Sequence, residues 1–453
     1  MQDYVHFSRF LGTSKHNNLI AVFHRLNPSP VYLEYNTWTT FLRNCNDKKF
    51  INILRQKRLI IDSKQTDKNY FKAFKELIES NFRNSSILYL ILTKQCNLEC
   101  NYCFIRHSSK VDRDKLMKPS IAKLGIDVWA RHISGGFNKN RQYFIIFYGG
   151  EPLLNLYTLQ KALEYIQLCQ NRHRLPRKNL NLVLATNGTL LNRKIAKLLK
   201  RYNIKVSIGL DGIKNVNDYY RKDSEGNGTF NRVIRAMTIL RQEGVDIWIS
   251  SALTPYSIRY NNRFINILER YKVDQFGFNI LRGKTLPFLK RKTERYHYYK
   301  MASDFIVRFS RSSEISKIYE RQIEERLRLF KEEKFCIIDC GGCTGQLVIH
   351  PNGDITNCPL VSRRIQNLTN TDSKFRIWDT SITKNWQKRL PLYNKRCTSC
   401  NAISICGGGC PWNVHSISRN IALRDNSICV LNNKVFEDWL WTKQRCNTNI
   451  YRP

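Results

Sequence analysis

The chain has 453 residues, 42% of them hydrophobic, and its 75 Lys and Arg against 36 Asp and Glu give a formal net charge of +39. This length favours two or three domains over a single core, and the apolar fraction argues against extended disorder. No apolar run approaches the roughly 18 residues that a membrane span needs, so a membrane protein is excluded.

The first 85 residues predict a small α+β domain. Two strand-like runs, NLIAVFHR and PVYLEYN, are separated by the turn-forming NPSP. Helical patterns follow around 38–45 and 48–57, then a strand-like LIID and an amphipathic helix over 68–82. So short a segment suggests an accessory domain, with a structural cap as the simplest role.

Residues 86–330 alternate between strands and helices. The strand-like runs are ILYLILT, YFIIFYGGEP, NLVLATNGT, IKVSIGLDG, VDIWISSALTP and QFGFNILRG. After the second run, Leu156, Leu159, Leu163 and Ile166 recur on one helix face. Six strands separated by helices predict an α/β fold, a partial (β/α)6 TIM-like barrel with parallel strands. Chemistry in such barrels lies where the strands end, which is where CNLECNYC, YGGEP, ATNG and GLDG fall.

Residues 331–453 predict a third, loop-rich domain that is dense in Cys and Gly. Its strands, QLVIHP and DITNC, are too short to fold by core burial, so metal ligation would supply the missing stability. The HPNGD stretch between them predicts a hairpin turn at Gly353.

The 15 cysteines are distributed unevenly. Because the start, MQDYVHFSRF, lacks the layout of a secretion signal, we expect a cytoplasmic protein, where clustered cysteines are more often metal ligands than disulfides. Cys45, Cys169 and Cys446 stand alone and are taken as ordinary thiols. The other cysteines form one group of Cys96, Cys100 and Cys103, and a second of Cys336, Cys340, Cys343, Cys358, Cys397, Cys400, Cys406, Cys410 and Cys429.

Cys96-x3-Cys100-x2-Cys103 offers three thiolates on one loop. Structural zinc takes four ligands, whereas a cubic 4Fe–4S cluster held by three cysteines keeps one open iron. An open iron can chelate the amine and carboxylate of an amino acid. Spacing alone favours the cluster and leaves zinc as an alternative.

Four motifs in order resemble the radical S-adenosylmethionine (radical SAM) enzymes over about 86–285: CNLECNYC, GGEP, ATNGTLL, and GLDG followed by NDYYR. The resemblance implies that Cys96, Cys100 and Cys103 hold a 4Fe–4S cluster and that S-adenosylmethionine binds it. It also implies an electron donor such as flavodoxin or ferredoxin, and a 5′-deoxyadenosyl radical that removes hydrogen from a C–H bond.

The same resemblance implies roles for the residues at the strand ends. Tyr102 would lie beside the adenine, and Arg221 would pair with the methionine carboxylate. Relatives commonly have serine in contact with the ribose where this chain has Gly209, and Ser207, on the same strand face, is our candidate replacement. Gly149, Gly150 and Glu151 would meet the methionine amino group, and Asn187 and Asp211 would line the cavity.

The second cysteine group matches the seven-cysteine pattern of SPASM domains: Cys343-x9-Gly353-x4-Cys358, then Cys397-x2-Cys400-x5-Cys406-x3-Cys410, then Cys429. A zinc ribbon would explain only the CxxC pair. The resemblance implies two auxiliary 4Fe–4S clusters. Cys343, Cys358 and Cys410, with Cys340 rather than Cys336 as fourth ligand, would hold the first, and Cys397, Cys400, Cys406 and Cys429 the second.

The N-terminal segment weakly resembles the domain with which maturases of ribosomally made peptides hold a leader as an added strand. Leaders are often acidic, which would give the basic surface a purpose, although a merely solvated basic surface is equally consistent. We therefore expect a peptide maturase that installs a cross-link, such as a carbon–carbon or thioether bond, with epimerisation and methylation open. No general base can be named from the sequence.

Two rival functions remain. In anaerobic sulfatase maturases, which act on a protein Cys or Ser, an aspartate follows the cysteine equivalent to Cys358, and here Pro359 stands there. A zinc-containing nucleic-acid-binding protein would use the basic surface and the 22 Tyr and 23 Phe, but it leaves GGEP unexplained.

Overall fold

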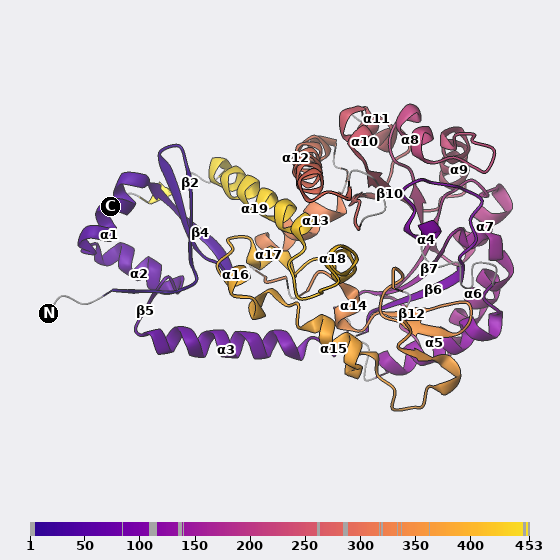
Figure 1. The fold of residues 1–453 in the computed structure, drawn as a ribbon, viewed down its shortest axis with the longest axis horizontal. Helices are drawn as coiled ribbons and strands as arrows, with labels where there is room; N and C mark the ends of the chain where they lie inside the picture. The colour runs from indigo at the N-terminus through magenta and orange to yellow at the C-terminus, as the bar shows by residue number, and fades with distance from the viewer. Residues whose placement is uncertain are drawn as a thin grey trace.

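The structure of the protein, a computed structural model, is shown in Figure 1. It describes residues 5–83, 85–107, 116–134, 138, 140–260, 263–283, 289–316, 318, 320–332, 334–336, 338–361, 363–446 and 450–451. Within these ranges, no helix is both long and apolar enough to cross a membrane.

A nine-stranded sheet runs through the centre of the molecule. Six of its strands are mutually parallel and follow one another in chain order, which confirms the predicted partial (β/α)6 barrel. These strands are β6 (Ile87–Thr93), β7 (Tyr143–Gly149), β8 (Leu180–Thr186), β9 (Ile204–Gly209), β10 (Ile247–Leu253) and β11 (Gln275–Ile280).

Helices cover one face of this sheet. Along β7, Ile145 and Phe147 are buried in the main core, whereas Ile146 and Tyr148, which point to the other face, are half-buried. The helices are α4 (Phe104–His107), α5 (Pro119–Ile133), α6 (Leu156–Asn171), α7 (Arg193–Arg201), α8 (Lys214–Tyr220), α9 (Phe230–Gln242), α10 (Pro255–Tyr260), α11 (Phe264–Arg270), α12 (Lys292–Ser316) and α13 (Arg321–Lys331).

The predicted apolar face of α6 is confirmed. Leu159, Leu163 and Ile166 are buried in the main core, and Leu156 packs against it at the start of the helix. That face anchors α6 on the sheet, so the loop that joins β7 to α6 is held at the carboxyl edge of the strands.

The C-terminal part adds three strands to the barrel sheet. β12 (Leu347–Ile349) pairs parallel to β6, and β13 (Asp354–Thr356) and β14 (Gln366–Asn367) follow antiparallel. The predicted hairpin is present, with Gly353 at φ +83° in its turn. The helices here are α14 (Gly341–Thr344), α15 (Ser381–Gln387), α16 (Lys395–Thr398), α17 (Ile403–Cys406), α18 (Pro411–Ser418) and α19 (Asn426–Cys446).

The N-terminal part forms a small sheet in the order β15-β4-β3-β2. Its strands are β2 (Leu11–His16), β3 (Leu19–His24), β4 (Asn27–Glu34) and β15 (Ile450–Tyr451), and β1 (His6–Phe7) pairs separately with β5 (Ile60–Ile61). The helices are α1 (Tyr35–Asn44), α2 (Lys48–Gln56) and the long α3 (Lys64–Ser80), which runs beneath the molecule in Figure 1.

The sequence interpretation of NPSP as a turn is wrong. Pro28 and Pro30 lie inside β4, and the chain reverses instead at Arg25 and Leu26. Proline lacks an N–H and is tolerated at the beginning of a strand or along an edge. Here β15 pairs β4 only at Tyr32 and Leu33, beyond both prolines.

Candidate active site

The first cysteine group lies on the loop after β6, at the carboxyl edge of the parallel strands. Cys100 is buried, Cys103 half-buried and Cys96 exposed. Leu98 donates its backbone N–H to Cys96 Sγ at 3.4 Å, and the Asn187 side-chain amide, from the loop after β8, reaches the same sulfur at 3.8 Å. Burial raises the pKa of Cys100 to about 12, and desolvation by the protein atoms around the Cys96 sulfur raises its pKa to about 11, although the residue as a whole is exposed. Binding of a metal would remove these protons.

The glycine pair after β7 packs against the cysteine loop. A Cβ on Gly149 would lie 2.0 Å from the Thr93 carbonyl oxygen, and one on Gly150 would lie 2.1 Å from that of Gln95. Gly149 also has φ +147°, and the Gly150 N–H donates to the Thr93 carbonyl at 2.9 Å. Both glycines are therefore required by contact between two loops of this chain. The expected approach to the methionine amino group stays a prediction.

The Glu151 carboxylate is fully buried and braces the end of β8. Its Oε1 accepts hydrogen bonds from Thr186 Oγ1 at 2.7 Å and from the Leu153 N–H at 3.0 Å, and its Oε2 accepts one from the Asn187 N–H at 2.8 Å. Burial raises the pKa of Glu151 to about 7, against the opposing effect of these hydrogen bonds. Glu151 is thus a positioning residue for the loop that carries Asn187, and its predicted contact with S-adenosylmethionine stays a prediction.

A buried ion pair joins the loop after β9 to the end of α8. Arg221 Nε lies 2.9 Å from Asp211 Oδ2, and Arg221 Nη2 lies 3.1 Å from Asp211 Oδ1. Asp211, which is fully buried, also accepts hydrogen bonds from the Ala252 N–H at 2.8 Å and from the Tyr102 hydroxyl. The two-point contact and the extra donors satisfy the carboxylate. This network ties Tyr102 of the cysteine loop to two strand ends.

The structure explains why Gly209 departs from the family pattern. A Cβ there would lie 2.5 Å from Arg221 Nη1 and 2.8 Å from its Cζ, so the guanidinium fills the room that a side chain would need. Ser207 lies half-buried on the same face of β9. Its predicted contact with the ribose stays a prediction.

The four cysteines expected around the first auxiliary cluster lie near one another. Cys343, Cys358 and Cys410 are buried and Cys340 is half-buried. A hydrogen bond to Cys340, together with burial, raises the pKa of Cys343 well above its usual range. Burial, then the charges of Cys340 and Cys410, raise the pKa of Cys358 in the same way.

The four cysteines expected around the second auxiliary cluster also gather. Burial and the charges of Cys406 and Cys397 raise the pKa of Cys429 to about 12. Burial also raises the pKa of Cys406, and the charge of Cys400 contributes to that increase. Cys336 lies with this second set, because its Sγ would be 2.8 Å from a Cβ on Gly407, next to Cys406.

Two tyrosines that we did not predict lie between the cysteine groups. The rings of Tyr89 and Tyr148 meet edge to face at 5.7 Å, on the helix-free face of β6 and β7. Burial raises the pKa of both hydroxyls. The charge of Cys358 raises each pKa further, and the charge of Cys103 does the same for Tyr148. Alternation along these strands could have marked both residues as facing inward.

The donor sets fit iron–sulfur clusters. In the described part of the chain, no His, Cys, Asp or Glu side chains gather as ligands of a single metal ion. The ligands of a cubic cluster each bind a different iron, so they stand further apart than ligands that share one ion. Three thiols on one loop match a cluster with an open iron, and two sets of four match fully ligated clusters.

Part of the barrel and most of the chain are similar to known proteins. Residues 90–258 match the family model described as the radical SAM superfamily. Radical SAM cyclopropyl synthase TigE of Paramaledivibacter caminithermalis is 23% identical over 435 residues, covering 92% of this chain and 87% of TigE. A cysteine-type anaerobic sulfatase-maturating enzyme of Clostridium perfringens is 26% identical over 340 residues, covering 72% of this chain and 88% of that enzyme.

Solved structures give the same fold. Native anSMEcpe with bound AdoMet and Cp18Cys peptide superposes with a TM-score of 0.64 at 22% identity, covering 80% of this chain and 98% of anSMEcpe. Streptococcus suis SuiB bound to precursor peptide SuiA superposes with a TM-score of 0.52 at 16% identity, covering 94% of this chain and 99% of SuiB.

Proposed function

Because residues 90–258 match the radical SAM superfamily, we propose that the chain is a radical SAM enzyme that modifies a small ribosomally made precursor peptide. The modification we propose is a cross-link or a related change that begins with hydrogen abstraction. We further propose that 1–85 holds the leader, that 86–330 is the radical SAM barrel, and that 331–453 carries two auxiliary 4Fe–4S clusters.

The observation that carries the proposal is the extent of the match. TigE and SuiB correspond to 92% and 94% of this chain, and SuiB is solved with its precursor peptide. The sulfatase-maturating enzymes leave a fifth or more of the chain without a counterpart, with coverages of 72% and 80%. A precursor-peptide substrate accounts for the whole chain, including the small N-terminal sheet.

The chain's own residues would prepare the site in a defined way. Cys96, Cys100 and Cys103 would hold the cluster, and the Asp211–Arg221 pair would keep Tyr102 in place beside it. When bound, the cluster and S-adenosylmethionine supply one-electron cleavage of the sulfonium and a 5′-deoxyadenosyl radical. A flavodoxin or ferredoxin would deliver the electron.

The half-buried face that carries Tyr89 and Tyr148 would receive the peptide. It lies near both the first cysteine loop and the first auxiliary set, because the charges of Cys103 and Cys358 both raise the pKa of Tyr148. A substrate radical formed there would lie near a cluster that can accept its electron, which is what oxidative bond formation requires. Ligation of each auxiliary cluster by four cysteines would favour electron transfer over substrate binding there.

A sulfatase-maturase-like reaction on a protein Cys or Ser is the second candidate, since an enzyme of that class matches 72% of the chain. Against it, the residue after Cys358 is Pro359, whose side chain has no carboxylate that could act as a base. The two candidates differ in substrate, so one assay separates them.

The test begins with the chain purified without oxygen and reconstituted with iron and sulfide. We expect about twelve irons, four for each of three cubic clusters, and formation of 5′-deoxyadenosine. Short peptides encoded beside the gene are then co-expressed with the chain and weighed. Loss of two hydrogens indicates a cross-link, whereas an unchanged mass with deuterium uptake indicates epimerisation.

A matched pair of variants controls this test. Cys100→Ala should abolish 5′-deoxyadenosine formation and peptide modification together, while Cys45→Ala, at a solitary thiol on the end of α1, should change neither. Conversion of a sulfatase-type Cys or Ser peptide, with no change in any co-encoded peptide, would establish the second candidate instead. Zinc in place of iron would refute both.

A further inference from the structure

The far end of the chain pairs with the N-terminal sheet. Ile450 and Tyr451 form β15 and run parallel to β4, opposite Tyr32 and Leu33. In Figure 1 the C-terminal marker accordingly lies beside α1, far from the barrel. The edge of β4 that would otherwise be open is therefore occupied by a strand of two residues.

The Tyr451 side chain packs against the first turn of α2 and the residue that caps it. Its ring stacks on Phe50 with centroids 4.5 Å apart and planes 25° apart, and its hydroxyl donates to Asp47 Oδ2 at 2.5 Å. The other oxygen of Asp47 caps α2 by accepting from the Phe50 N–H at 2.9 Å. Tyr451 is thus recognised by both a ring contact and a hydrogen bond, which is how a binding site distinguishes one side chain of an extended peptide from others.

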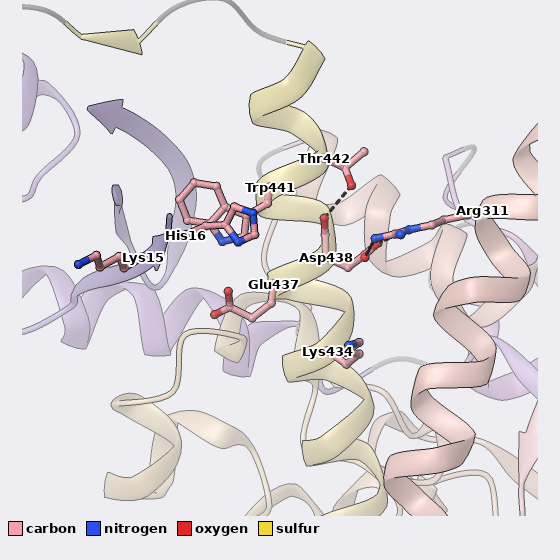
Figure 2. A pocket seen from close by; sticks show the side chains of 8 residues that line it. All are labelled: Lys15, His16, Arg311, Lys434, Glu437, Asp438, Trp441 and Thr442. Carbon is pink, nitrogen blue, oxygen red and sulfur yellow. Dashed lines mark hydrogen bonds and ion pairs between the residues drawn. The ribbon is translucent and has the colours of Figure 1, made fainter. Parts of the chain in front are cut away.

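The opposite edge of the sheet is covered much more firmly. The Thr13 carbonyl of β2 accepts from Asn401, and Ser14 of β2 bonds with both Glu437 and Trp441 of α19. Figure 2 shows His16 of β2 beside Trp441 of α19, whose ring centroids lie 5.1 Å apart. A new strand at β2 would have to push α19 away, whereas at β4 it has to replace two residues.

We propose that Ile450–Tyr451 is a placeholder on the β4 edge, and that an extended segment of the precursor peptide must displace it to bind there. This inference rests on the proposed function and deepens it by naming the site and the sequence it reads. The segment carries an aliphatic residue followed by an aromatic one. Exposed Lys48, Lys49 and Arg55 on α2 favour an acidic segment.

Hydrogen exchange of the full chain tests the placeholder directly. Tyr451→Ala should speed exchange of the β4 amides around Tyr32 and Leu33 by about tenfold or more, because the local opening becomes more frequent. Tyr451→Phe, which keeps the ring and loses only the bond to Asp47, should give a smaller increase. Tyr157→Ala, at an exposed tyrosine on α6, is the matched control and should give none. Unchanged protection in Tyr451→Ala would overturn the inference.

A synthetic heptapeptide with the sequence of 447–453, NTNIYRP, tests the docking site. Added at millimolar concentration to a chain that ends at 446, it should restore the lost protection of β4, because millimolar is the effective concentration of a tethered segment. The same peptide with Ala in place of Tyr should not. Equal effects of the two peptides, or no effect of either, would refute recognition of the aromatic residue.

The competition itself is measured on the reconstituted enzyme. Tyr451→Ala should lower the apparent KM for the modified precursor by about tenfold without changing kcat, because the placeholder no longer competes. An unchanged KM would overturn displacement. The exchange experiments need neither cluster nor substrate, so their outcome stands even if no peptide proves to be modified and the proposed function fails.

Discussion

Gly209→Ala probes the contact between β9 and the Arg221 guanidinium. Gly209 lies on β9 opposite Ser250 of β10, and its missing Cβ leaves the space in which the Arg221 guanidinium lies. Three atoms of that guanidinium would be 2.5, 2.8 and 2.9 Å from the new carbon, closer than carbon approaches such atoms in folded proteins. Because Arg221 is held at two points by Asp211, it cannot rotate away without loss of the pair.

The expected cost follows from the burial of that pair. Asp211 is fully buried and the Arg221 side chain is 13% exposed. If the pair shifts as a unit, overpacking costs about 1–3 kcal/mol. If it separates, the buried carboxylate is left uncompensated and the cost is about 3–5 kcal/mol. At about 1–2 °C per kcal/mol for a cooperative unit of this size, the midpoint of thermal unfolding should fall by a few degrees in the first case and further in the second. 5′-Deoxyadenosine formation should fall with it, since Tyr102 donates to the same carboxylate.

Gly277→Ala is the matched control. Gly277 of β11 flanks the same Ser250 from the other side, but its nearest neighbour, Arg321, would lie 3.6 Å from a new Cβ. That distance is ordinary van der Waals contact, so the free energy of unfolding of the control should lie within about 1 kcal/mol of that of the parent chain.

A double-mutant cycle identifies the cause. In an Arg221→Ala background the clash is absent, so adding Gly209→Ala should cost little, and the coupling between the two sites should be about 1–3 kcal/mol. Equal costs of Gly209→Ala in both backgrounds would show that the guanidinium does not occupy this space, and the explanation for the departure from serine would be wrong.

Three further predictions address the cysteines and the inner face. Cys340→Ala should lower the iron content after reconstitution by up to about four irons per chain, the content of one cubic cluster. The Cys336 thiol lies beside Cys406, so Cys336→Ala should leave the first set intact. Loss of the first cluster in Cys336→Ala instead of Cys340→Ala would exchange the roles of the two cysteines. Tyr148→Phe should leave 5′-deoxyadenosine formation unchanged and slow peptide modification about 3- to 10-fold, the worth of one hydrogen bond; an unchanged rate would exclude contact with the peptide. Burial raises the pKa of Glu151 from 4.5 to about 7, so the folded state binds more protons than the unfolded state in that window, and stability should fall as pH rises through it. Glu151→Gln should remove this dependence, measured as the thermal midpoint of the cluster-free chain between pH 5 and pH 8, and a slope that persists would point to another group.

The barrel could be read from the sequence because buried parallel strands are continuous apolar runs. ILYLILT and NLVLAT need no partner to be recognised, and the motifs after them mark the functional edge. β2 was not predicted, since LGTSKH lacks apolar alternation and gains its stability from β3 and from α19. The 21-residue helix α19 was also missed, because its Cys429 was considered only as a ligand.

Contacts between distant segments could not be predicted. The Gly209–Arg221 contact depends on where α8 ends, and the pairing of Tyr451 with Leu33 joins opposite ends of the chain. A two-residue strand carries no periodicity, so no pattern in the sequence announces it. Tyr89 and Tyr148 lie on seven-residue strands, where alternation could have placed them on the inner face, but their nearness to Cys358 depends on a distant segment of the chain.

The pairing of β12 with β6 also has a consequence for how the protein matures. Leu347 and Leu88 are separated by more than half of the chain, and contacts this distant form late in folding. The strands β6 to β11 pair with near neighbours and can form first. The hairpin that presents Cys358 docks on β6 only afterwards, so the thiols of the first auxiliary set stay apart during early folding. Iron delivered before that step would meet the three cysteines of one loop but no complete set of four, which predicts that clusters bound by the second cysteine group would be inserted last.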